Sequence, residues 1–318
     1  MASESQRRIE VAAAVLIRDA GRSFLLAQRP SGKAFEGYWE FPGGKVEPGE
    51  SATHAMCREL HEELGIQVDA EDVYPWLTRD FEYPHAAVRL RFFRIYRWRG
   101  EVHGREGQRF AWQTATAPDA SPMLPANGPI LRALALPDHY GITQAMAMGV
   151  DAFQHKLKMA LDNGLKLVQV REKTMTAHAL RRFTAQVVEC AHQHGARVMI
   201  NGDADLANAT GADGVHLTSA QLHTLHARPA CEWVAASCHS PEELSAATRL
   251  GADFAVAGPV ATTPTHPGAA VLGWDGFARC VTDTTMPIYA IGGMQPADCV
   301  HARRHGAHGI AMLRGAWL

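Results

Sequence analysis

The chain has 318 residues, 47% hydrophobic and 20% charged, an ordinary globular balance in a chain long enough for two cores. Its formal net charge of −2 excludes a global basic field that would attract duplex nucleic acid or an anionic membrane. No apolar run approaches the roughly 20 residues that cross a bilayer, and the polar first residues lack the core of a signal peptide. With scattered cysteines and no Cys-x-x-Cys pair, these features predict a cytoplasmic protein with reduced thiols that acts on small molecules.

The first half of the chain predicts strands around one short helix. Apolar or alternating runs predict strands over residues 11–17, 24–27, 73–77 and 89–98. Ser51 is a candidate N-cap and Gly65 a natural stop, so we expect the helix to lie between them. A second short helix is expected over residues 129–136, where this half of the chain closes.

Three glutamates share one face of the predicted helix. Glu59, Glu62 and Glu63 stand at i, i+3 and i+4, a spacing that brings side chains together on a helix. Such an acidic face is commonly only a solvated surface. Because like charges at these positions repel, a cation would stabilise them, and carboxylate oxygens suit Mg²⁺ or Mn²⁺. A metal held there could polarise a phosphoryl oxygen and activate a water molecule.

The residues around this helix favour the metal site over the solvated surface. Gly44, Glu50, Arg58 and Gly65 stand at fixed spacing from the three glutamates, and the whole pattern matches the Nudix hydrolase signature at every specified position. The first half of the chain therefore resembles this family, which implies an α/β/α sandwich with a mixed sheet. The resemblance gives these four residues structural roles, and Arg58 can pair with Glu50 to fix the loop onto the helix.

The same resemblance implies a reaction that depends on Mg²⁺, with Mn²⁺ as the alternative ion. A metal-activated water would attack a phosphorus of a nucleoside triphosphate and release the monophosphate and pyrophosphate. Glu62 and Glu63 would be the principal metal ligands, and Glu59 the general base or an additional ligand. The family also implies roles for the carbonyl of Gly43 as a metal ligand and for Glu106 as a further metal-binding or catalytic carboxylate.

Residues outside the signature resemble those of MutT-type 8-oxo-dGTP diphosphatases. The backbone of Glu40 and Phe41 stands where this group contacts the purine. Arg29 and Asn127 stand where an arginine contacts the nucleotide and an asparagine amide contacts the 8-oxoguanine edge. Taken alone, Arg29 could be a surface arginine and Asn127 a turn residue, although an amide suits a purine because it donates and accepts at once. The implied function is sanitation of the nucleotide pool, with a free nucleotide as substrate.

Near Pro137-Asp138-His139 the pattern changes to short apolar strands that alternate with amphipathic helices. Strands are predicted over residues 140–143, 165–170, 197–200, 214–217, 233–236, 254–257, 287–291 and 309–313. Eight such repeats fit a closed parallel (β/α)8 TIM barrel, so the overall fold class is α/β. We therefore expect two domains, residues 1–136 and residues 137–318.

Polar residues gather just after these strands, where barrel enzymes place their sites. Their pattern resembles the thiamine-phosphate synthase and TenI group across this half of the chain. The resemblance implies phosphate or ligand contacts for Gln169, Arg171, Lys173, Asn201, Ser237, Thr263, Thr265, Gly292 and Gly293. Active synthases place magnesium-binding aspartates where this chain has Gly202 and Gln221, a departure that weakens the case for synthase chemistry because Mg²⁺ needs hard oxygen ligands.

Several functions therefore stay open for the second half. The barrel could join a pyrimidine diphosphate to a thiazole phosphate, bind a phosphorylated thiamine intermediate without reaction, or support oligomerisation. The first half could likewise hydrolyse thiamine-related diphosphates instead of an oxidised purine. The oligomeric state is not readable from the sequence.

Overall fold

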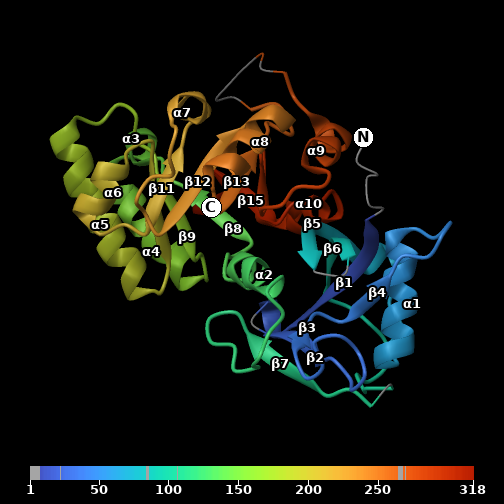
Figure 1. The fold of residues 1–318 in the computed structure, drawn as a ribbon. Coiled ribbons are helices and arrows are strands. Elements are labelled where there is room, and N and C mark those ends of the chain that lie inside the picture. Colours follow the sequence, from blue (N-terminus) through green and yellow to red (C-terminus); the bar gives the residue numbers. More distant parts are fainter. Residues whose placement is uncertain (1–7, 22, 84–85, 106, 264–267, 269) are drawn as a thin grey trace. The chain divides into compact units, whose positions relative to one another are not determined.

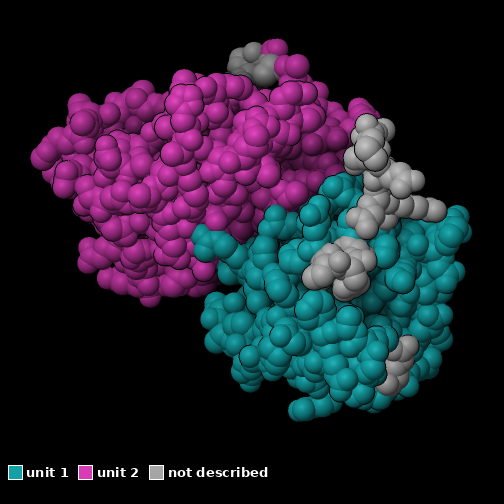
Figure 2. All heavy atoms as spheres, in the orientation of Figure 1, with its two compact units in different colours: residues 1–135 teal, residues 136–318 magenta. Residues whose placement is uncertain are grey.

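A computed structural model describes residues 8–21, 23–83, 86–105, 107–263, 268 and 270–318. The chain divides into two compact units, Met1–Ala135 and Leu136–Leu318, which Figure 2 colours separately. None of the helices in the described ranges has the length and apolarity that a bilayer span requires.

Unit 1 is built on a mixed sheet of seven strands with the central order β3-β2-β1-β6-β5, to which β4 adds beside β1 and β7 beside β2 (Figure 1). β1 runs parallel to β6 and antiparallel to β2 and β4. The strands are β1 (Ile9–Arg18), β2 (Ser23–Gln28), β3 (Trp39–Glu40), β4 (Gly43–Lys45), β5 (Val73–Tyr83), β6 (Ala86–Ile95) and β7 (Phe110–Thr114). The helices are α1 (Ala52–Leu64) and α2 (Asn127–Leu134), with 3-10 turns η1 (Asp19–Gly21) and η2 (Ala70–Asp72).

Alternate residues of β1 belong to two different cores, because successive side chains of a strand point to opposite faces of the sheet. On one face, Leu16 joins the core that contains Leu60 of α1. On the other face, Ile17 joins the core that contains Ile130 of α2. One helix therefore packs on each face, and the predicted α/β/α sandwich with a mixed sheet is confirmed.

The helix α1 has the predicted ends. The hydroxyl of Ser51 accepts a hydrogen bond from the backbone N–H of His54, and Gly65 adopts a left-handed φ of 69° at the C-terminus. The apolar and alternating runs that predicted strands do not include β3, β4 and β7, whose two to five residues form strands only by pairing with β1 and β2. The second helix begins two residues earlier than expected, at Asn127.

Unit 2 is a closed barrel of eight parallel strands in the order β10-β11-β12-β13-β14-β15-β8-β9, which confirms the predicted architecture. Its strands are β8 (His139–Ile142), β9 (Leu167–Val170), β10 (Arg197–Asn201), β11 (Gly214–Leu217), β12 (Trp233–Cys238), β13 (Phe254–Ala257), β14 (Ile288–Ile291) and β15 (Gly309–Met312). The helices are α3 (Ala145–Met148), α4 (Val150–Asp162), α5 (Ala177–Gln193), α6 (Ala204–Thr210), α7 (Ser219–Thr224), α8 (Pro241–Leu250), α9 (Gly273–Val281) and α10 (Cys299–Arg304), with 3-10 turns η3 (Pro296–Asp298) and η4 (Gly315–Trp317).

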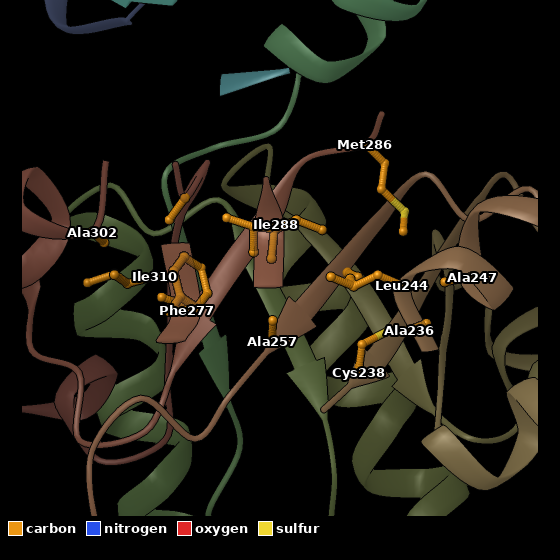
Figure 3. Close-up of a cluster of buried hydrophobic side chains, with 14 of the residues drawn as sticks. Ala236, Cys238, Leu244, Ala247, Ala257, Phe277, Met286, Ile288, Ala302 and Ile310 are labelled. Atoms are coloured by element: carbon orange, nitrogen blue, oxygen red, sulfur yellow. The ribbon is translucent and has the colours of Figure 1, made fainter. Parts of the chain in front are cut away.

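The barrel has an inner core and an outer layer of apolar contacts. Tyr140, Phe254 and Tyr289 fill the interior, with their rings 5.4 to 5.7 Å apart. The outer layer lies between the strands and the surrounding helices. Ile288 of β14 and Phe277 of α9 belong to it, in the cluster of which Figure 3 shows a part. Since the strands are held from both sides, the residues at their C-terminal ends stand on a rigid frame.

Candidate functional sites

Arg58 ties the loop that precedes α1 to the acidic face of the helix. Its Nε and Nη2 donate to the two carboxylate oxygens of Glu50 at 3.1 and 3.0 Å, which is the ion pair expected from the sequence. Nη2 also donates to the carbonyl of Lys45 at 3.1 Å. On the helix itself, Nη1 donates to Glu59 at 2.8 Å and to Glu62 at 3.2 Å. One guanidinium thus holds the loop and offsets part of the negative charge of the helix.

Two glycines bring the loop backbone directly onto two carboxylates. The N–H of Gly43 donates to Oε2 of Glu63 at 3.1 Å. At Gly44 a methyl group would lie 2.2 Å from the carboxylate of Glu59, so only glycine fits there without displacing this side chain. This close approach explains why the signature requires a glycine at Gly44.

The three glutamates do not share one environment. Glu59 and Glu63 line a cavity of about 610 Å³ together with Gly43 and Gly44. The side chain of Glu59 is 15% exposed, whereas that of Glu62 is 56% exposed and does not line this cavity. Glu106 lies outside the described residues. The sequence predicted the shared helical face and not this division.

The donor set in the cavity fits a divalent metal that is completed by substrate. Within the described ranges, no three His, Cys, Asp or Glu side chains stand close enough to hold a metal on their own. Glu59, Glu63 and the backbone of Gly43 supply hard oxygen atoms, the ligands that Mg²⁺ takes when water and substrate phosphates provide the rest. The residues present therefore suit an ion bound together with a phosphorylated ligand.

The same cavity also has apolar lining residues and an amide. Phe41 and Leu90 line it, and the buried Asn127 donates from Nδ2 to the carbonyl of Trp39 at 3.0 Å. This bond fixes the orientation of the amide, and Asn127 lines the cavity. The structure thus places Phe41 and Asn127, 86 positions apart, in one pocket with the carboxylates of α1.

Arg29 and Glu40, which both line this cavity, form an ion pair. Nη1 of Arg29 lies 2.7 and 2.6 Å from the two carboxylate oxygens of Glu40, and its Nε donates to the carbonyl of Ala34 at 2.6 Å. Burial raises the pKa of the Glu40 carboxyl above its usual value, and the charge of Arg29 opposes this shift. Lys33 and Lys45 also line the cavity, which therefore carries cations for a polyphosphate as well as carboxylates for a metal.

A second cavity, of about 930 Å³, lies at the C-terminal ends of the barrel strands. It brings together all the barrel residues predicted from the sequence that the structure describes, namely Gln169, Arg171, Lys173, Asn201, Ser237, Thr263, Gly292 and Gly293. Thr265 lies outside the described residues. The intervening Glu172 does not line this cavity, because its carboxylate accepts the N–H groups of Ala145 and Met146 at 2.6 and 3.0 Å.

Sequence reasoning missed the chain of hydrogen bonds by which Tyr140 and His216 join two of these residues, Gln169 and Ser237. Nε2 of Gln169 donates to the hydroxyl of Tyr140 at 3.0 Å, and that hydroxyl lies 3.1 Å from Nδ1 of His216. Nε2 of His216 lies 2.9 Å from Oγ of Ser237. All members keep a partner if Tyr140 donates to Nδ1 and the Nε2–H of His216 donates to Ser237, which leaves the hydroxyl proton of Ser237 for a ligand.

His216 stays neutral in this chain. Burial lowers its pKa to about 3, and the nearby charge of Arg171 acts in the same direction. A neutral imidazole both donates and accepts, as its place between Tyr140 and Ser237 requires. The signal available in the sequence was the period of the strand, because a histidine between Val215 and Leu217 must point into the barrel.

The two positions at which the chain departs from the synthase pattern lie next to each other. Nε2 of Gln221 donates to the carbonyl of Gly202 at 2.8 Å, and its Oε1 accepts the N–H of Thr218 at 3.0 Å. Asp203, which directly follows Gly202, accepts the N–H of Leu206 at 2.8 Å as the N-cap of α6.

Comparison with known proteins assigns each unit to a family. The model of the thiamine monophosphate synthase family matches residues 139–316, and the NUDIX domain model matches residues 8–134. The 8-oxo-dGTP diphosphatase of Haemophilus influenzae is 39% identical over 126 residues, which are 40% of this chain and 90% of that protein.

Relatives of the second unit are thiamine-phosphate synthases. The enzyme of Gloeobacter violaceus is 36% identical over 158 residues, or 49% of this chain, and the chain spans 46% of the length of that relative. Among solved structures, the thiamine phosphate pyrophosphorylase from Pyrococcus furiosus is 25% identical with a TM-score of 0.48, covering 55% of this chain and 85% of that one.

Proposed function

The chain belongs to the thiamine monophosphate synthase family over residues 139–316 and is a Nudix hydrolase over residues 8–134, and from this premise we propose that its first unit hydrolyses 8-oxo-dGTP to 8-oxo-dGMP and pyrophosphate. One observation carries the proposal. A single cavity is lined by the signature carboxylates Glu59 and Glu63 and also by apolar residues and the amide of Asn127. A nucleoside triphosphate needs both kinds of group, because its polyphosphate binds a metal and its base suits an apolar surface with an amide.

Nudix hydrolases generally need a divalent metal, and we propose Mg²⁺, with Mn²⁺ as the alternative. Glu63, the carbonyl of Gly43 and Glu62 would hold the ion at the helix face, where it would polarise the phosphate and activate water. Glu59 is placed to accept the proton of the attacking water or to act as a further ligand. As water adds to a phosphorus of the triphosphate, the bond from that phosphorus to its bridging oxygen breaks, and the products are the monophosphate and pyrophosphate.

For the base, Asn127 is the residue suited to recognise an oxidised purine. Its Nδ2 already donates to Trp39, so its orientation is fixed and Oδ1 can accept from a ligand. Oxidation at C8 turns N7 of guanine from an acceptor into an N–H donor. The amide oxygen of Asn127 can accept from this N–H, so it would favour 8-oxoguanine over guanine. Arg29 would contact the nucleotide once its pair with Glu40 opens or rearranges.

A substrate panel tests this proposal. Hydrolysis of 8-oxo-dGTP, dGTP and thiamine diphosphate should be measured with the full chain and Mg²⁺, and we expect kcat/KM to be highest for 8-oxo-dGTP. Asn127→Ala should lower kcat/KM for 8-oxo-dGTP towards the value for dGTP, because the donor at N7 loses its acceptor. Equal or faster turnover of thiamine diphosphate would contradict the choice of substrate.

For the barrel, we propose binding of a phosphorylated small molecule of the kind that thiamine-phosphate synthases use. The observation in favour is the cavity that joins Arg171 and Lys173 to the backbone of Gly292 and Gly293, groups that suit a phosphate. Synthase activity remains the second candidate. It is tested by incubating the full chain with the pyrimidine diphosphate, the thiazole phosphate and Mg²⁺, and formation of thiamine phosphate above the level of an Arg171→Ala variant would establish it.

A further inference from the structure

The lining of the barrel cavity is cationic. Arg171, Lys173 and Arg314 line it, and no Asp or Glu side chain is found among its described lining residues. The cavity of unit 1 differs, because Glu40, Glu59 and Glu63 line it beside its cations. A divalent cation among three positive side chains, with only neutral side-chain oxygens for ligands, is electrostatically disfavoured.

Three acidic side chains close along the chain to residues that line this cavity are engaged elsewhere. Glu172 accepts two backbone N–H groups at the start of α3, and Asp203 caps α6. Glu243, on α8, accepts the N–H of His239 at 2.6 Å and the hydroxyl of Ser219. To reach a metal, each would have to give up these hydrogen bonds and leave backbone groups without a partner.

The neutral residues beside the cavity are also committed to the protein. The amide of Gln221 spans from the carbonyl of Gly202 to the N–H of Thr218, so both of its ends are in use. Gly202 and Gln221 stand where active synthases have their two magnesium-binding aspartates. In this chain the two residues are joined by a hydrogen bond between an amide and a carbonyl, and neither offers a carboxylate. The donor chemistry does not fit the Mg²⁺ that the synthase resemblance implies.

The same lining fits a phosphate directly. Arg171 and Lys173 can neutralise its charge, and the hydrogen-bond chain from Tyr140 through His216 leaves the hydroxyl of Ser237 free to donate to it. The cavity also has apolar lining residues that would cover a ring, among them Ile142, Val256, Leu272, Ile291 and Leu313.

We propose that the barrel cavity binds the phosphate ester of a small aromatic ring without a divalent cation, so that only the first unit of this chain is metal-dependent. The inference rests on the proposed binding of a phosphorylated ligand by the barrel. It excludes a synthase reaction that needs a metal-bound diphosphate in this cavity.

Calorimetric titration of the full chain with hydroxyethylthiazole phosphate tests the proposal. We expect the same dissociation constant in EDTA and in Mg²⁺. Arg171→Gln should weaken binding about ten-fold or more, since a charge-assisted bond to phosphate is lost, whereas Arg182→Gln removes the same charge from the exposed face of α5 and should leave binding unchanged. Ser237→Ala gives a second, smaller change at the site.

The outcomes distinguish metal independence from phosphate binding itself. Binding seen only with Mg²⁺ would overturn metal independence and leave the proposed phosphate ligand standing. No binding in either medium would overturn both. Equal weakening by Arg171→Gln and Arg182→Gln would show a non-specific charge effect and overturn the assignment to this cavity.

A carboxylate introduced into the lining of the barrel cavity should make binding of the phosphate ester depend on Mg²⁺. Thr218 lines the cavity and caps α7, a position at which aspartate and asparagine both serve as N-caps. In EDTA, Thr218→Asp should bind the probe about ten-fold more weakly than Thr218→Asn, because of charge repulsion, and Mg²⁺ should restore part of the loss. Equal affinities of the two variants in EDTA, or an equal gain from Mg²⁺, would overturn the proposal.

Discussion

The glutamates of α1 differ in what surrounds each carboxylate. Glu63 accepts the N–H of Gly43 inside the cavity, and Glu59 lies against Gly44 and pairs with Arg58. Glu62 is 56% exposed and accepts at 3.2 Å from Nη1 of Arg58, the nitrogen that also donates to Glu59. An exposed carboxylate is more easily replaced by water as a metal ligand than one held by the protein.

This difference predicts an order of effects on hydrolysis. Glu63→Gln should lower kcat about 100-fold or more, because it removes a fixed ligand charge where the metal acts. Glu62→Gln should still remove most activity, with a loss of about ten-fold, since the side chain is exposed and water can substitute. Both are measured at saturating Mg²⁺, with circular dichroism to show retained folding. A Glu62→Gln variant that loses more activity than Glu63→Gln would contradict this order.

His216 makes the stability of the barrel depend on pH. Its folded pKa of about 3 lies below the ordinary value of 6.5, so its contribution to stability is complete above pH 6.5 and is lost as the pH falls towards 3. In His216→Gln this contribution is absent, and the fall in stability between pH 7 and pH 4 should be shallower. Hydrogen exchange of β11 at several pH values measures it, and parallel pH profiles for the two proteins would contradict the buried neutral state.

At the scale of elements, the loop–helix unit of β4 and α1 depends on close backbone approach. Gly44→Ala should lower kcat strongly with a modest loss of stability, because the new methyl group displaces the carboxylate of Glu59 without requiring an unusual φ. Gly128→Ala is the matched control, since a methyl group at that position would meet open space, with nothing within 4 Å. Comparable activity of both variants would show that the position of Glu59 is not critical.

The sequence predicted elements best where their signals are local. The ends of α1 follow from the cap at Ser51 and the left-handed Gly65, which act within one helical turn. Strands β3 and β4 carry no such signal, because two or three residues show no period and become strands only through pairing with β2 and β1. The site geometry depends on these short strands, since β4 carries both glycines that contact the carboxylates.

At the scale of the whole molecule, each unit has cores of its own. Ile130 of α2 belongs to a core of unit 1, whereas Leu136 belongs to the barrel interior and its carbonyl lies 3.0 Å from Nε2 of His308. We therefore expect residues 1–135 alone to hydrolyse 8-oxo-dGTP with the kcat/KM of the full chain. A large loss in a fragment that is folded by circular dichroism would show that the barrel contributes to the reaction.

The order of residues alone determined most of the longer elements, which family signatures are present and which side chains are available for chemistry, because caps, periodicity and motif spacing act over a few neighbouring positions. Only the tertiary structure decided which glutamates enter the first cavity, and that Asn127 reaches Trp39 and Tyr140 reaches His216, 88 and 76 positions away. It also decided that Gln221 bonds to Gly202, and that the described residues lining the barrel cavity include no Asp or Glu side chain. Such contacts arise when a sheet closes, and closure depends on the packing of the whole unit rather than on any local stretch.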